Sequence, residues 1–233
     1  MAQIHTPKLT STNKILIIFM VLFFVLGAIM EKNGLSLIGI LGLTANGVFQ
    51  GAIYQLFTWP FIGRGLLEVV FNCLLLWFLG SELENMWGKR RYLVFVLWTI
   101  MGAGIIFLGL SLFFFSGSSL ALTGMAGLVD ALLLAYAILF PDRVFHFMLI
   151  IPVQAKYFCM ILIGMQLYFG FFSSAAVLAW GQLAAMACAF CYMILVSSPT
   201  LKKLFTFSQR RKARSNHLKL VKKNGDRPPK YWQ

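Results

Sequence analysis

The sequence predicts an all-α membrane protein with six transmembrane helices, and three observations lead to that fold class. Of its 233 residues, 60% are hydrophobic and 12% are charged, whereas a soluble globular domain has about 45–50% apolar and about 25% charged residues. The apolar residues fall in charge-poor runs of the length that crosses a bilayer, roughly 17–25 residues each. Most charges lie between these runs or near the end of the chain.

Six apolar segments are expected to form transmembrane helices. The first is predicted to be a retained helix, because no small-residue cleavage site precedes the charges that follow it. The charges between Glu82 and Arg91 are expected to close the second helix, and Pro141 is expected to end the fourth. The six predicted helices cover residues 15–30, 65–80, 92–115, 120–140, 155–172 and 174–196.

Residues 35–64 are apolar but are interrupted by glycines and by Pro60. The aromatic string from Tyr54 to Phe61 includes Trp59, and Trp and Tyr are enriched where a membrane meets water. This first loop is therefore predicted to lie at the interface and not to cross the bilayer.

The basic residues predict the topology and the partner of the tail. With both termini cytoplasmic, eighteen Lys and Arg residues lie inside, and Lys32 and Arg64 lie outside, in agreement with the positive-inside rule. Eleven of the twenty follow Pro199, which favours anionic lipid headgroups over nucleic acid. We expect a cytoplasmic segment 1–14, a membrane domain 15–196 and a basic cytoplasmic tail 197–233.

Four polar side chains lie inside the predicted helices, where polar groups are costly and mark candidate functional sites. Glu68 and Asn72 are four residues apart and share a helix face, whereas Asp130 and Gln182 lie in the fourth and sixth helices. These groups either lock the bundle through hydrogen bonds or line a binding cavity. No residue pattern predicts a metal site, a cofactor or a disulfide framework.

The first part of this region resembles the rhomboid family of intramembrane serine proteases. Residues 55–72 are similar to the end of the rhomboid first loop and the start of its second helix. In that family a His-x-x-x-Asn pair helps to bind the oxyanion. Asn72 matches the asparagine, and Glu68 stands at the position of the histidine.

Two further motifs extend the resemblance to about residues 50–195. The run from Gly124 to Gly127 resembles Gly-x-Ser-Gly, with Ala126 at the position of the nucleophilic serine. In the sixth helix, Gln182 stands at the position of the family's catalytic histidine. A methyl group cannot attack a carbonyl, so the resemblance implies a rhomboid-like scaffold with a degenerate dyad.

Pseudoproteases of this kind bind client proteins, and the resemblance implies that class. Glu68, Asn72, Asp130, Gln182, Gly124 and Gly127 are the expected client-binding or polar-cavity residues. The partners would be membrane lipids and transmembrane segments of clients. Two alternatives stay open: an active intramembrane endopeptidase with unusual residues, and a proton or solute pathway that uses Glu68 and Asp130. Short loops and the lack of extra domains favour a bacterial plasma membrane.

Overall fold

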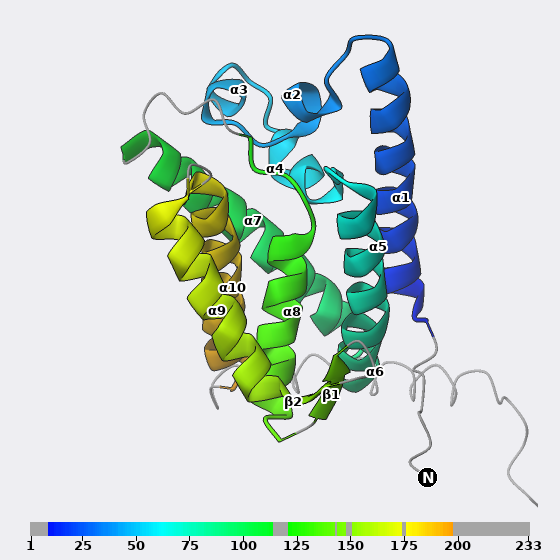
Figure 1. Cartoon of the computed structure of the whole chain (residues 1–233), viewed down its shortest axis with the longest axis vertical. Coiled ribbons are helices and arrows are strands. Elements are labelled where there is room, and N and C mark those ends of the chain that lie inside the picture. Colours follow the sequence, from blue (N-terminus) through cyan, green and yellow to red (C-terminus); the bar gives the residue numbers. More distant parts are fainter. Residues whose placement is uncertain (1–8, 114–120, 143, 148–150, 174–175, 198–233) are drawn as a thin grey trace, which may run out of the picture. The chain divides into compact units, whose positions relative to one another are not determined.

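The computed structural model describes residues 9–113, 121–142, 144–147, 151–173 and 176–197. In these residues the chain is an all-α bundle of the multi-span membrane class (Figure 1), as predicted. The basic tail and the first eight residues lie outside the described residues. Five helical segments are long and apolar enough to cross a membrane, at Ser11–Lys32 (α1), Leu66–Trp87 (α5 to α6), Lys89–Phe113 (α7), Ala155–Phe172 (α9) and, within α10 (Ala176–Ser197), Ala176–Leu195.

The second spanning segment is longer than predicted. It runs through α5 (Leu66–Leu75), a π-helical turn (Leu76–Gly80) and α6 (Ser81–Trp87) without a break. The charges at Glu82 and Glu84 therefore lie inside the helix, and the prediction that they close it was wrong. A helix accommodates such charges where neighbouring elements supply hydrogen-bond partners. The left-handed backbone at Gly88 (φ 81°) ends the segment.

The fourth apolar helix, α8 (Ala126–Leu139), is shorter than predicted. Its 14 residues measure roughly 21 Å at 1.5 Å per residue, less than the roughly 30 Å hydrocarbon core of a bilayer. Residues 121–125 are not helical, so the expected start at residue 120 was wrong. Backbone groups of this segment pair with the first loop, because Leu122 and Leu43 exchange hydrogen bonds of 2.8 and 3.0 Å.

The first loop folds into short helices, namely α2 (Leu37–Leu41), α3 (Ala45–Phe49), α4 (Gln55–Thr58) and a 3-10 turn at Trp59–Phe61. None of these is long enough to span a bilayer, as predicted. The buried Gln55 side chain holds the loop together. Its Nε2 donates to the Ile40 carbonyl at 3.1 Å, and its Oε1 accepts from the Thr44 amide at 3.2 Å.

The two ends of the bundle differ in structure. Helices α2 to α4 lie at one end, whereas α6 and a β-hairpin lie at the other (Figure 1). The hairpin joins α8 to α9 and pairs β1 (Val144–Phe147) with β2 (Ile151–Gln154) in antiparallel register. The sequence predicted only a short apolar connection here. Helix α8 is the most enclosed element, with buried residues on all sides from Gly127 to Ala137.

A buried polar network ties α1 to α6 and α7 at the end opposite the first loop. The Thr12 hydroxyl donates to Glu84 Oε1 at 2.6 Å, and Asn13 Nδ2 donates to Glu84 Oε2 at 3.3 Å. The Tyr92 hydroxyl in turn donates to Asn13 Oδ1. Gly80 permits this approach, since a Cβ there would lie 2.6 Å from both Asn13 Oδ1 and the Tyr92 hydroxyl.

We predict that Glu84→Ala destabilises the bundle, because it leaves the buried Thr12 hydroxyl without its acceptor and removes one of the two acceptors of Asn13 Nδ2. The loss should be about 1–3 kcal/mol, which lowers Tm by several degrees, measured by thermal unfolding in detergent. Asn85→Ala is the matched control, since Asn85 is exposed on the same helix. Equal Tm values for the two variants would show that the network does not stabilise the fold.

Candidate functional site

The candidate site is built around the start of α8. Gly124 adopts the left-handed backbone conformation, with φ 98°, which residues with a Cβ rarely adopt. Its amide donates to the Trp59 carbonyl at 3.0 Å. A Cβ built on Gly124 would lie 2.7 Å from Glu68 Oε1. Glycine is therefore required both by the turn and by the approach of the Glu68 carboxylate.

Arg64, just before α5, holds the first loop against the segment that leads into α8. Its Nε donates to the Thr123 hydroxyl at 2.7 Å, and its Nη2 donates to the Ala121 carbonyl at 2.9 Å. The positive charge of Arg64 also attracts the Glu68 carboxylate. From the sequence, Arg64 was expected only to be a positive charge on the outer side of the membrane. The feature that could have marked Arg64 as a site residue is its position as a single arginine directly before a spanning helix.

Gly127 brings α8 against α10. A Cβ built on Gly127 would lie 3.3 Å from the Ala185 Cβ and 3.7 Å from the Gln182 Cα. The same position is 3.8 Å from the ring of Trp59, which belongs to the first loop. The two positions that resemble a catalytic dyad, Ala126 and Gln182, thus belong to helix segments in direct contact.

The structure brings most of the predicted site residues to one region. Glu68 reaches Gly124, and Gly127 reaches Gln182, so three helices meet at the start of α8. Asn72 is buried one helical turn after Glu68 on α5, whereas Ala126 and Gln182 are partly exposed. The region therefore contains hydrogen-bond acceptors and amide donors, and part of it is exposed at the protein surface.

Asp130 has a different neighbourhood. Its carboxylate accepts a hydrogen bond of 3.4 Å from Gln166 Nε2 of α9, and it interacts electrostatically with Cys159 of the same helix. This contact fastens α9 to α8 one turn below the start of α8. Gln166 was not singled out from the sequence, because α9 matches none of the motifs and its amide is one polar group on an apolar helix.

The start of α8 also supplies backbone donors. The first amides of an α-helix have no partner within the helix, and no side chain caps α8 at Met125. Together with Glu68, Asn72 and Gln182, these amides can bond both the carbonyl and the amide groups of another backbone. Among the described residues, no three His, Cys, Asp or Glu side chains group in a way that could hold a metal ion.

Comparison with known families identifies a matching family model. A family model described as "Eukaryotic integral membrane protein (DUF1751)" matches residues 14–221. No curated protein matches the chain. The family is eukaryotic, so the expectation of a bacterial plasma membrane was wrong. Loop length follows from how neighbouring helices are connected, and it does not distinguish a bacterial from a eukaryotic membrane protein.

We predict that Gly127→Val disrupts the contact between α8 and α10, because its side chain would overlap Ala185. Overpacking of this kind costs about 1–3 kcal/mol. Gly164→Val on α9 is the matched control, since nothing lies within 4 Å of a Cβ there. Thermal unfolding of both variants in detergent measures the difference. A Gly127 variant as stable as the Gly164 variant would contradict the close approach of α8 and α10.

Proposed function

The chain belongs to the family of eukaryotic integral membrane proteins described as DUF1751, and we propose that it is a rhomboid-like pseudoprotease that binds transmembrane or membrane-proximal segments of client proteins without cleaving them. The observation that carries the proposal is the convergence of Glu68, Gly124, Gly127 and Gln182 at the start of α8. These residues belong to the three motifs that resemble the rhomboid family.

The side chains at this site do not suit peptide hydrolysis. Ala126 offers a methyl group where a hydroxyl would have to attack. Gln182 carries an amide, which cannot take up a proton near neutral pH. Glu68 Oε1 approaches Gly124, two residues before Ala126, and a carboxylate near the reacting carbonyl would repel a developing oxyanion.

The same side chains suit the binding of an irregular transmembrane segment. Backbone groups that leave a helix inside a bilayer must find other partners, and such groups occur where a client helix is broken by Gly or Pro. Glu68 can accept from client amides, the amides at the start of α8 can donate to client carbonyls, and Asn72 and Gln182 can do both. The clients we propose are therefore transmembrane segments with a local break in the helix.

The basic tail complements this role. Eleven basic residues and a single acidic residue, Asp226, follow Pro199 in the sequence. Close to an anionic leaflet each contributes about 1 kcal/mol of attraction. The tail, residues 197–233, would hold anionic headgroups on the cytoplasmic side, on which the distribution of basic residues also puts both termini.

Activity can be tested directly on the purified protein. A fluorophosphonate probe, which reacts with activated serines, should leave the wild-type chain unlabelled. Ala126→Ser alone should also fail to cleave a transmembrane substrate, because Gln182 supplies no base. The double variant Ala126→Ser/Gln182→His is the stricter comparison, since it supplies both a nucleophile and a base while Glu68 still opposes the oxyanion. Labelling or cleavage by the wild-type chain would establish an active endopeptidase and end the pseudoprotease proposal.

Client binding can be tested in liposomes with two labelled transmembrane peptides that differ only at their centre. Energy transfer should report tighter binding of a peptide with a central Gly-Pro than of its all-Leu counterpart. Glu68→Leu and Asn72→Leu should each weaken this binding about three- to thirtyfold, because a hydrogen bond within a bilayer contributes about 0.6–2 kcal/mol.

Asn85→Leu is the matched control for Asn72→Leu in the binding experiment. It makes the same change in the same continuous helix, at an exposed position away from the site. The control should bind the Gly-Pro peptide as the wild type does. Equal affinity of the wild type for the two peptides, or equal loss in the control, would refute binding at the start of α8.

A further inference from the structure

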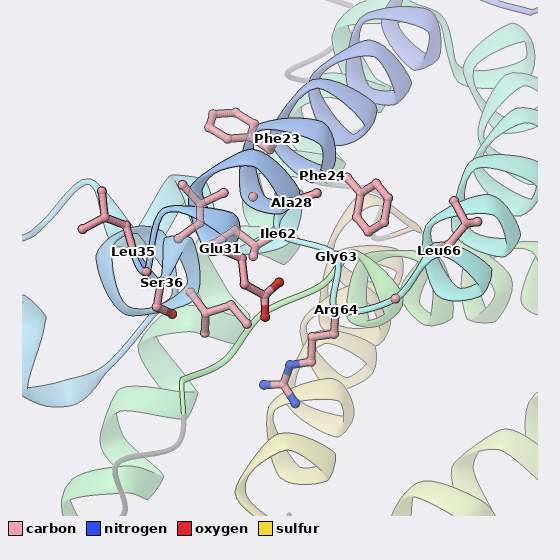
Figure 2. Close-up of a pocket in the computed structure, with 15 residues that line it drawn as sticks. Phe23, Phe24, Ala28, Glu31, Leu35, Ser36, Ile62, Gly63, Arg64 and Leu66 are labelled. Carbon is pink, nitrogen blue, oxygen red and sulfur yellow. The ribbon is translucent and has the colours of Figure 1, made fainter.

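A second cavity lies outside the site around α8. It occupies about 460 Å³ between the last turns of α1, residues 34–38 of the first loop and residues 62–66 before α5 (Figure 2). Sites for small ligands commonly occupy about 300–1,000 Å³, so the cavity has the size of a binding site. All of its lining residues belong to the described part of the chain.

The wall of this cavity is about equally polar and apolar, and it is open to the surroundings. Phe23 and Phe24 of α1 line it together with Leu35 and Leu66. Leu35 is 54% exposed and Leu66 is 67% exposed. In a protein that spans a bilayer, apolar side chains with this exposure contact lipid, so the cavity lies where an acyl chain can extend from it along the surface.

Two opposite charges lie within the cavity. Glu31 is in the last turn of α1, and Arg64 precedes α5. Figure 2 shows the carboxylate and the guanidinium on the same side of the cavity. In the described part of the chain neither forms an ion pair with the other. The Glu31 charge is therefore available to a bound molecule, and Arg64, which also attracts Glu68, can offer the N–H groups that Thr123 and Ala121 leave free.

Arg64 is held in a fixed orientation for such a molecule. Thr123 and Ala121 take up two of its N–H groups, through Nε and Nη2. A guanidinium has five N–H donors in a planar fork, so the remaining donors, including both on Nη1, can bind an anion. Guanidinium groups match the geometry of phosphate particularly well.

We propose that this cavity binds one phosphoglyceride with a zwitterionic headgroup. The phosphate lies at Arg64, the ammonium group lies at Glu31, and the start of an acyl chain packs against Phe23 and Phe24. One positive and one negative group in the cavity match the charges of such a headgroup. A net anionic headgroup would bring its uncompensated charge close to Glu31. The proposal does not depend on client binding at α8, because none of the client-binding residues Glu68, Asn72, Gly124, Gly127 and Gln182 lines the cavity. Arg64 is shared, since it lines the cavity and also holds the segment that leads into α8.

Native mass spectrometry of the full chain in detergent tests the proposal. The protein is mixed with equal amounts of palmitoyl-oleoyl phosphatidylcholine and palmitoyl-oleoyl phosphatidylglycerol, which differ in mass and charge. The basic tail is expected to retain phosphatidylglycerol in every variant, so the readout is the change between variants. Wild-type protein should retain one phosphatidylcholine, and glycerophosphocholine, which has no acyl chains, should not displace it at the same concentration.

Glu31→Gln should lower the ratio of retained phosphatidylcholine to phosphatidylglycerol about tenfold, because a charge-assisted contact to the ammonium group is lost. Lys32→Gln is the matched control, since it removes the neighbouring charge outside the cavity, and it should leave the ratio unchanged. Arg64→Gln should reduce retention of phosphatidylcholine by a similar factor.

Ala28→Trp provides a test that does not alter the charges. Ala28 lines the cavity, and a Trp side chain there would fill the space of the acyl chain, so retention of phosphatidylcholine should fall while Tm is preserved. The proposal would be overturned if Glu31→Gln and Ala28→Trp both retained the two lipids in the wild-type ratio. It would also be overturned if glycerophosphocholine displaced the lipid at equal concentration.

Discussion

Backbone groups within a bilayer must be paired inside the protein, and this constraint shapes the region around α8. The helix is too short to span the membrane alone, so the chain enters it through the non-helical residues 121–125. Their backbone pairs with Leu43 and Trp59 of the first loop, and the Arg64 side chain binds Thr123 and the Ala121 carbonyl. Through these hydrogen bonds the first loop holds the start of α8 in position.

That arrangement explains why polar groups gather at the start of α8. A helix that begins inside a bundle leaves unpaired amides at its first turn, and acceptors near them are favourable. Glu68 reaches Gly124, whereas Glu84 is bound by α1 and Asp130 by Gln166. These contacts do not involve the side chains of Ala126 or Gln182, so the framework around the start of α8 does not require a nucleophile or a base at those two positions.

The candidate site could be predicted in part from the sequence. Spacing alone put Glu68 and Asn72 on one face. The motif resemblance named Gly124 and Gly127, and only the structure shows their close approaches to Glu68 and to α10. Arg64 and Gln166 could not be found this way, since their partners lie 57 or 59 residues and 36 residues away along the chain. The wide separation of Glu31 from Arg64 likewise concealed the second cavity.

The sequence by itself determined the class of the protein, because the number, length and apolar composition of its segments follow directly from the thickness of a bilayer. It also located the first loop and the last two helices, with α9 at residues 155–172 as expected. Only the tertiary structure decided where α8 begins and how far the second helix extends. The start of α8 depends on hydrogen bonds to Leu43, and the extent of the second helix depends on hydrogen bonds from Thr12 and Asn13 to Glu84. These partners are distant in the sequence, so local composition cannot reveal them.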